Sequence, residues 1–221
     1  MEHWRFDVKE LIWFYLCIIN KIKRIDVRTI LLILTLLALT MSCTRVNPGD
    51  IREGDVVFIE SKSQQSPYIK AGTMCKWTHC GVVVKTANSL KILEASKTVT
   101  LTNIDKFIGR AKNGNYMIKR PRQQLQNPIS YRKWLGQPYD LAFKFDNGKM
   151  YCSELVWLVY KEQGIELCKP RKVGDYFVVK LAHSKLVGKY KKAKWLRNLM
   201  KKRSITLDQY AVAPSDLARA I

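Results

Sequence analysis

Apolar residues in the middle of the chain come in short runs that turn residues interrupt. The runs are rich in Val, Ile and Leu, and turn formers such as Asn88 and Ser89 separate them, a pattern that predicts β-strands. We expect strands at 55–60, 80–85, 90–95, 99–101 and 116–119. Because these runs follow one another closely along the chain, the sequence predicts an antiparallel meander.

The apolar pattern becomes helical in the second half of the chain. Residues 153–163 form the clearest helical run, and Gly164 marks its end. The apolar content of this run is nearly continuous, so the helix should be buried. A short helix is also expected at 131–135. Strands followed by a core helix predict an α+β fold.

The start of the chain has the layout of an export signal. Residues 29–42 contain no charge, basic residues stand before them, and Cys43 follows. This run is shorter than the roughly 20 apolar residues that cross a bilayer. Ser42 and Cys43 resemble the cleavage site of a bacterial lipoprotein, which implies that Cys43 is lipidated and becomes the mature N-terminus. An uncleaved signal anchor is the alternative.

A second apolar patch at 11–19 leaves further alternatives open for the leader, namely a start assigned too far upstream or a membrane-embedded hairpin. We therefore expect a signal, lipoprotein leader or anchor at 1–43, a polar linker at 44–53 and one domain at 54–221. The protein should be attached to the membrane in the cell envelope and face the periplasm. If the signal is not cleaved, it would instead anchor the chain in the inner membrane.

The charge of the chain predicts an anionic partner. Among 221 residues there are 39 Lys and Arg but only 18 Asp and Glu, which gives a formal net charge of +21. This excess suits nucleic acid, anionic lipid or an acidic polymer. The export signal makes nucleic acid the least expected of these partners. Six cysteines in a chain of this length are too few for a disulfide scaffold.

The basic residues concentrate in the segment 169–203, where Asp175 is the single acid. The end of this segment mixes bases with apolar residues and resembles a helix that lies on an anionic membrane surface. If it is helical, Tyr190, Trp195, Leu199 and Met200 could enter the interface. The alternative is an inserted segment whose basic face is simply solvated.

The candidate chemistry centres on Cys152 and His79. Cys152 stands at the start of the buried helix, where unpaired N–H groups and the helix dipole stabilise a thiolate. His79 begins an apolar strand, and an imidazole beside the thiol can stabilise the thiolate or take its proton. Glu94 is an acid in an otherwise apolar strand that should pair with the His79 strand. A carboxylate there can orient the imidazole. Each of the three also has a structural alternative: a buried thiol, a hydrogen-bonded histidine and an outward-facing charge.

Several blocks around these residues occur in an order that resembles a known family. The blocks are 54–58 (Gly-Asp-Val-Val-Phe), 78–83 (Thr-His-Cys-Gly-Val-Val), 93–95 (Leu-Glu-Ala), 136–140 (Gly-Gln-Pro-Tyr-Asp), 151–156 (Tyr-Cys-Ser-Glu-Leu-Val) and 214–217 (Pro-Ser-Asp-Leu). They are similar to the YiiX-like branch of the circularly permuted, NlpC-type, papain-like cysteine hydrolases. In papain-like enzymes the Cys comes before the His, whereas the permuted branch has the His first, as here.

The resemblance implies an antiparallel β-sheet or barrel packed against the helix that carries the Cys. It also implies a triad of Cys152, His79 and Glu94, although related families use His, Asn or Asp at the third position. The expected function is hydrolysis of an amide in a cell-wall peptide or an N-acylated small molecule. The alternatives are a lipid-directed acyltransferase or thioesterase of the same fold, and a non-catalytic basic lipoprotein that binds a membrane surface. No cofactor is expected, and the Cys and His spacing supports no metal site.

The sequence does not determine the substrate, the oligomeric state or the role of residues 1–20. It also leaves open the disulfide state of Cys75, Cys80 and Cys168. Because strand side chains alternate, Cys80 should point away from His79.

Overall fold

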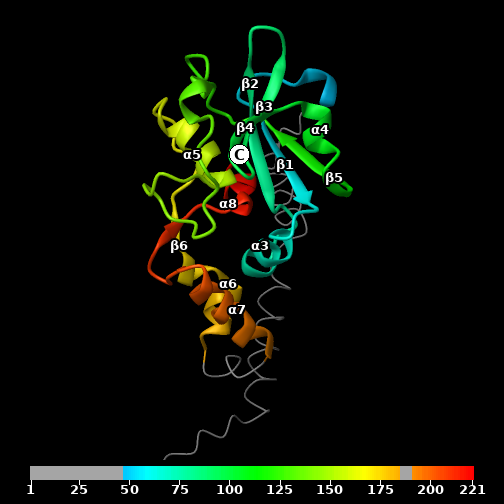
Figure 1. Cartoon of the computed structure of the whole chain (residues 1–221). Coiled ribbons are helices and arrows are strands. Elements are labelled where there is room, and N and C mark those ends of the chain that lie inside the picture. Colours follow the sequence, from blue (N-terminus) through cyan, green and yellow to red (C-terminus); the bar gives the residue numbers. More distant parts are fainter. Residues whose placement is uncertain (1–46, 185–190) are drawn as a thin grey trace, which may run out of the picture. The chain divides into compact units, whose positions relative to one another are not determined.

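The computed structural model describes residues 47–184 and 191–221, which belong to one compact unit spanning Thr44–Ile221. In chain order the elements are η1 (Pro48–Asp50), β1 (Val56–Ser61), α3 (Ser66–Thr73), β2 (His79–Lys85), β3 (Leu90–Ala95), β4 (Val99–Thr102), α4 (Ile104–Ile108), β5 (Ala111–Lys119), η2 (Tyr131–Trp134), α5 (Cys152–Lys161), β6 (Arg171–Lys172), η3 (Val173–Asp175), α6 (Phe177–Ala182), α7 (Lys191–Lys202), β7 (Tyr210–Ala211) and α8 (Pro214–Ala220) (Figure 1).

The expected leader at 1–43, its lipidated Cys43 and the apolar patch at 11–19 all lie outside the described residues, and so does Tyr190 of the expected membrane interface. Within the described ranges, the helices are all too short or too polar to cross a membrane.

Five strands form the main sheet, in the order β4-β3-β2-β1-β5, and every pairing is antiparallel. The first four strands are paired in chain order, although α3 stands between β1 and β2, and this order confirms the predicted antiparallel meander for this part. The fifth strand returns to the far edge beside β1, with Ile118 opposite Val57. A separate two-stranded sheet pairs β6 with β7. The α+β class and the antiparallel sheet packed on helices are confirmed.

The sheet is buried on both faces, which explains why its central strands read as continuous apolar runs rather than as alternating ones. One face packs against α5 and contributes Val56, Phe58, Cys80, Val82 and Leu93 to a shared core with Leu155, Val156 and Val159. The other face packs against α4 and contributes Val57, Ile59, Val83 and Ile92 to a cluster around Phe107. The helix that carries Cys152 is thus fixed to the α5 face.

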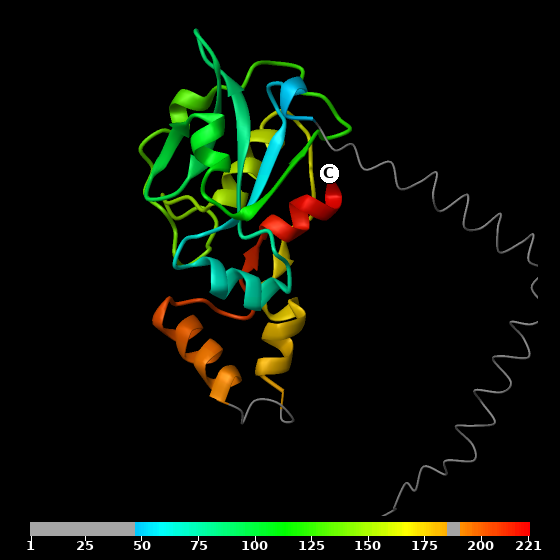
Figure 2. The ribbon, with the colours of Figure 1, turned by 90° about the vertical axis from the view of Figure 1, so that its right-hand side faces the viewer.

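The basic segment forms most of a third cluster, in which α6 and α7 pack against each other. Leu196 and Met200 of α7 are buried against Tyr176 and Val179. The helix α3 contacts α6 and lies between the sheet and this pair of helices (Figure 2). Met200 is therefore not available to a membrane interface, and that part of the sequence prediction is wrong. The apolar stripe of α7 serves packing instead.

The last residues of the chain fasten this third cluster to α5. The Ser153 hydroxyl donates to the Val212 carbonyl at 2.7 Å, and the Val212 N–H donates to the Tyr151 hydroxyl at 3.1 Å. The Asp216 carboxylate accepts from the Ala213 N–H at 2.9 Å and from the Tyr176 hydroxyl. The segment 212–216 thus links the start of α5 to Tyr176 of the third cluster.

Gly81 permits the closest approach between β2 and β3. A methyl group at this position would stand 2.4 Å from Cγ2 of Ile92 and 2.9 Å from the carbonyl oxygen of Leu93. We expect Gly81→Ala to lower the free energy of unfolding by about 1–3 kcal/mol, because overpacking a filled core costs that much. Urea denaturation followed by tryptophan fluorescence measures this change.

Gly49→Ala is the matched control, since nothing lies within 4 Å of a methyl group there. It should change the free energy of unfolding by less than about 0.5 kcal/mol. Equal effects of the two substitutions would contradict the close approach at Gly81.

Candidate active site

Cys152 is the first residue of α5 and is 2% exposed. Tyr151 precedes the helix, and its N–H donates to the Glu154 carboxyl group at 3.3 Å, which fixes the first turn. Burial raises the pKa of Glu154 to about 8. At neutral pH Glu154 is therefore mostly uncharged and does not oppose a negative charge on Cys152. The N–H groups of the first turn and the positive end of the helix dipole favour that charge.

His79 and Glu94 meet between β2 and β3. Val82 pairs with Leu93 across these strands, so extending the register by one pair puts Glu94 opposite Gly81, two residues from His79. The Nε2 atom of His79 lies 2.6 Å from Oε2 of Glu94. The imidazole also stacks on Phe107, with ring centroids 5.4 Å apart. The ring is therefore held at one edge by a carboxylate and on one face by an aromatic side chain.

The Glu94 carboxylate is fully buried and keeps its charge through its partners. Besides His79, it accepts hydrogen bonds from the Thr102 hydroxyl and from Nη2 of Arg110, both at 2.5 Å. Burial by itself would raise the pKa of Glu94. Its bonds to His79, Arg110 and Thr102 outweigh that effect and lower the pKa to about 2. Glu94 is thus an anion at every physiological pH.

Cys152 and His79 lie close enough to change each other's ionisation. Burial alone would lower the pKa of His79, but the interactions of its ring with Cys152 and Glu94 raise that pKa to about 9. The pKa of Cys152 lies well below its usual range. A hydrogen bond with the Cys80 thiol has the largest lowering effect on this pKa. Burial opposes it, and the charge of His79 and its hydrogen bond to the thiol lower the pKa further. Since Nε2 of His79 faces Glu94, the nitrogen left for the thiol is Nδ1. The pair is therefore a thiolate and an imidazolium at neutral pH.

Cys80 and Tyr139 are two neighbours of the thiol that sequence reasoning missed. Cys80 packs in the core on the α5 face, while His79 stacks on Phe107 of α4, so the two side chains do alternate as expected. The α5 face is, however, the face from which Cys152 approaches. Burial raises the pKa of the Cys80 thiol and of the Tyr139 hydroxyl, and hydrogen bonding to Cys152 adds to both effects. Both groups therefore remain protonated and can donate to the thiolate.

Tyr139 belongs to the block 136–140, which the sequence singled out without giving it a role. A bridge between Tyr139 and Met150 holds this block beside the residue pair that precedes Cys152. Asp140 fixes the intervening loop, because its carboxylate accepts from the N–H groups of Ala142 at 2.8 Å and Lys144 at 2.6 Å. The order of the blocks along the chain was the only signal that pointed to this residue.

The four cysteines among the described residues all carry free thiols. Cys75, Cys80 and Cys168, whose pairing the sequence left open, form no disulfide here. Burial raises the pKa of Cys168 to about 12. Cys152 differs from both Cys80 and Cys168, because its pKa shifts downward.

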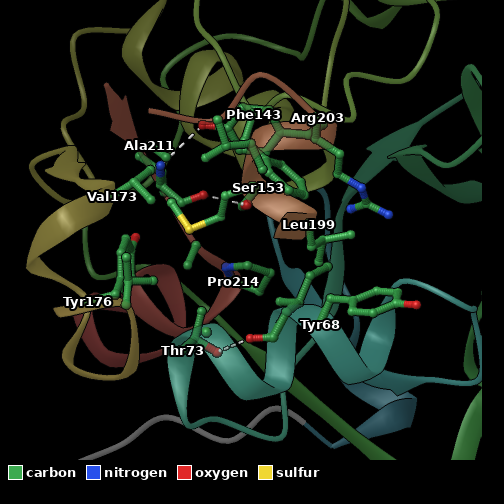
Figure 3. A pocket seen from close by; sticks show the side chains of 18 of the residues that line it. Tyr68, Thr73, Phe143, Ser153, Val173, Tyr176, Leu199, Arg203, Ala211 and Pro214 are labelled. Atoms are coloured by element: carbon green, nitrogen blue, oxygen red, sulfur yellow. Dashed lines mark hydrogen bonds between the residues drawn. The ribbon is translucent and has the colours of Figure 1, made fainter. Parts of the chain in front are cut away.

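A pocket opens beside Cys152 on the side away from the sheet. Its lining comes from α3, α7, the start of α5 and the segment 211–214 (Figure 3). Its cavity volume is about 120 Å³. This is smaller than the pockets of about 300–1,000 Å³ that hold drug-sized ligands.

Comparison with known proteins gives one family match. A family model described as "Permuted papain-like amidase enzyme, YaeF/YiiX, C92 family" matches residues 50–220. Over 130 residues the chain is 29% identical to a protein of Escherichia coli (strain K12) described as uncharacterized protein YiiX. That match covers 56% of this chain and 64% of the relative, so the chain spans less than two thirds of the relative's length.

A solved structure from Escherichia coli O157:H7, described as metalloprotein yiiX, is also similar. The TM-score is 0.59 and the sequence identity is 25%. The similarity covers 75% of this chain and 91% of the solved chain.

The electrostatics of the site predict how Cys152 responds to pH. Its thiolate should persist to mildly acidic pH, so alkylation by iodoacetamide should change little between about pH 8 and pH 6. Alkylation of an ordinary thiol would slow about tenfold for each pH unit over this range. Glu94→Gln removes a charge that raises the pKa of His79, so the pKa of His79 falls in this variant. The imidazolium then loses its proton at a lower pH than in the wild type. Without that positive charge beside it, the pKa of Cys152 rises. Alkylation of Cys152 in this variant should fall at least about tenfold at pH 6.

The measurement is the alkylation rate of the Cys152 peptide by mass spectrometry. Glu162→Gln is the control, because Glu162 pairs with Lys133 on the surface. The same pH profile in all three proteins would show that Glu94 does not act on the thiol.

Proposed function

This chain belongs to the permuted papain-like amidase family, and we propose that it hydrolyses amide bonds with Cys152 as nucleophile, His79 as acid and base, and Glu94 as the group that orients His79. The YiiX-like resemblance and the permuted papain-like fold that the sequence indicated are both confirmed by the family match and by the solved YiiX structure. The family supports a cysteine-hydrolase type of activity. The single observation that carries the triad is the buried His79–Glu94 pair beside a thiol of low pKa at a helix N-terminus.

In the first half of the reaction, the Cys152 thiolate attacks the carbonyl carbon of the amide. The charge that develops on the carbonyl oxygen is stabilised by N–H groups at the start of α5, including that of Cys152. The imidazolium of His79 gives its proton to the leaving nitrogen, the C–N bond breaks, and an acyl group remains on Cys152 as a thioester.

In the second half, neutral His79 takes a proton from water as the water attacks the thioester. The C–S bond breaks, which releases a carboxylic acid and restores the thiolate–imidazolium pair. Glu94 stabilises the imidazolium and holds Nε2, so that the other ring nitrogen faces the reaction throughout. Arg110 and Thr102 act indirectly, because their hydrogen bonds hold the Glu94 carboxylate in place.

The expected substrates are amides of a cell-wall peptide or of an N-acylated small molecule. Transfer of the acyl group from Cys152 to an acceptor other than water is the second candidate function, and the apolar pocket beside the thiol favours it. A basic lipoprotein without catalysis is the remaining alternative.

The solved relative described as a metalloprotein raises the question of a metal in this chain. Over residues 47–184 and 191–221, no group of three or more His, Cys, Asp and Glu side chains is arranged to hold a metal ion. These residues do not fit a metal centre, and each step above is assigned to side chains and backbone alone.

We also propose that the protein is a lipoprotein of the cell envelope, attached through Cys43, and that the segment 169–203 faces an anionic membrane. The side chains of Lys191, Lys194 and Lys201 on α7 are exposed. The apolar side of this helix is used for packing, so the attraction would be electrostatic.

Substitutions of Cys152, His79 and Glu94 should lower hydrolysis to different degrees. Cys152→Ala and His79→Ala should abolish hydrolysis of an acyl-aminocoumarin amide. Glu94→Gln should lower kcat by roughly 10²–10⁴-fold at an unchanged fold, because the orienting charge is lost. Cys168→Ala is the matched control and should retain activity. Full activity of Cys152→Ala would rule out the proposed mechanism and leave the non-catalytic alternative.

Charge reversal on α7 should weaken membrane binding. We expect the protein without residues 1–43 to bind anionic vesicles at low salt and to be released by added salt. Lys191→Glu, Lys194→Glu and Lys201→Glu together should weaken binding by roughly 100-fold, because each base near the surface contributes about 1 kcal/mol. Co-flotation with vesicles measures the fraction of protein that is bound.

The matched control reverses three exposed lysines elsewhere, Lys85, Lys97 and Lys149. If both triple variants bind equally, or if the unaltered protein does not bind at low salt, the membrane orientation is wrong.

A further inference from the structure

A second cavity lies on the side of the sheet that faces α4, next to the buried Glu94 carboxylate. Its lining comes from the end of β3, from β4, from α4 and from Arg110, and we call it the Arg110 cavity. Its volume is about 350 Å³, which is enough for a small molecule. Among the described residues, none that lines the pocket beside Cys152 also lines this cavity.

Two cationic side chains border the Arg110 cavity. The Arg110 guanidinium binds Glu94 through Nη2 at 2.5 Å and lies over the Phe107 ring, 5.1 Å from its centre. Its Nε is buried and has no hydrogen-bond partner in the described part of the chain. Because the side chain is 39% exposed, the guanidinium keeps donors for a ligand. Lys106 of α4 is exposed and forms no ion pair within residues 47–184 and 191–221.

Uncharged donors complete the lining. The hydroxyl groups of Ser96 and Thr100 and the side-chain amide of Asn103 make no hydrogen bond to any other described residue. The Thr102 hydroxyl is different, because it already donates to Glu94. The cavity therefore brings two cations and three unused polar side chains to one place.

The charges around the cavity favour an anion. Glu94 is the one acid among the described residues of the lining, but its side chain is only 1% exposed and binds His79, Arg110 and Thr102. Asp105 is exposed beside Lys106 in α4 and does not line the cavity. A ligand therefore meets the positive charges of Arg110 and Lys106, which attract an anion and repel a cation.

The arrangement of the donors favours a phosphate group over a carboxylate. A carboxylate is planar, and a single guanidinium can satisfy both of its oxygens. A phosphate group has three terminal oxygens and carries a charge of about −2 at neutral pH. Donors from α4, from β4 and from Arg110 approach from separate elements, so they can reach three oxygens that point in different directions.

We propose that the Arg110 cavity binds a phosphate group, either as the free ion or as part of a small phosphomonoester. Lys106 and Arg110 bind the charged oxygens, and the Thr100 hydroxyl donates to one of them. Arg110 then bridges the phosphate and Glu94. This site is separate from the Cys152 thiol, and the proposal does not depend on the hydrolase function.

The first measurement is calorimetric titration of the full chain in detergent micelles, at neutral pH and constant ionic strength. The probes are inorganic phosphate and glycerol 3-phosphate, and tighter binding of the second would identify the ester as the ligand. We expect a dissociation constant of about 1 mM or less. Lys106→Gln should weaken binding at least about tenfold, because a hydrogen bond between charged groups is lost.

The matched variants separate the cavity from general surface charge. Thr100→Val keeps the branched shape and removes the hydroxyl, so it should weaken binding about threefold to tenfold. Lys85→Gln removes the same charge as Lys106→Gln from an exposed position that does not line the cavity. It should bind both probes as the wild type does.

The second measurement locates the site without any substitution. The wild-type full chain is acetylated with an N-hydroxysuccinimide ester in the presence and absence of millimolar glycerol 3-phosphate, and the modified lysines are quantified by mass spectrometry. A bound phosphate should slow acetylation of Lys106 at least about threefold, because it holds the ammonium group in an ion pair. Acetylation of Lys85 should not change.

Three results would overturn the proposal. The first is that neither probe binds at millimolar concentration. The second is that Lys106 and Lys85 behave alike, in their variants or in their protection, which would show only screening of surface charge. The third is that acetate binds as tightly as phosphate, which would make the cavity a site for carboxylates instead.

Discussion

The site depends on the buried Glu94 carboxylate and the three groups that neutralise it. An unpaired carboxylate in the interior is strongly unfavourable, whereas a charge with several hydrogen-bond donors is tolerated. Here His79, Arg110 and Thr102 supply the donors, and they come from β2, from the residue before β5 and from β4. The sheet must therefore bring these strands into one register before Glu94 can be satisfied. The same requirement fixes the imidazole that faces Cys152.

The thiol is then positioned by a second, independent constraint. The helix α5 is packed on the opposite face of the sheet from α4. Its first residue, Cys152, interacts with His79 and Cys80. Three kinds of stabilisation act on the thiolate at once: helix N–H groups, the positive imidazolium, and donation from protonated neighbours. Because each is fixed by packing, the charge does not depend on movement when substrate arrives.

The sequence predicted the parts of this molecule that local patterns determine. It placed β3 at 90–95 and the helix that starts beside Cys152, because apolar periodicity and turn residues mark such elements. It missed the first half of β5, which is polar, and it could not place β5 beside β1, since spacing along the chain does not reveal that pairing. Arg110 as a partner of Glu94 and Cys80 as a partner of Cys152 were missed for the same reason.

The basic segment 169–203 shows that the sequence of one helix does not determine what its apolar face contacts. Its apolar stripe fits a membrane surface or another helix equally well, and only the presence of α6 decides between them. The sequence could not predict the pocket, because its walls come from six separate stretches of chain. Resemblance to a family pointed to the proposed triad, while Arg110, Cys80 and Tyr139 were identified as neighbours of its members from the structure.

The hydrogen bonds of Val212 also bear on when the surroundings of Cys152 are complete. Val212 bonds both residues that flank Cys152 in the chain, and it lies 59 positions after Ser153. The Lys119 ammonium likewise donates to the Ala218 carbonyl across 99 residues of sequence. Contacts of such long range form late in folding, because the intervening loop must first be closed. The surroundings of the thiol are thus completed only when the segment around Val212 has folded back onto the start of α5, so a chain cut before Val212 leaves Cys152 without these contacts.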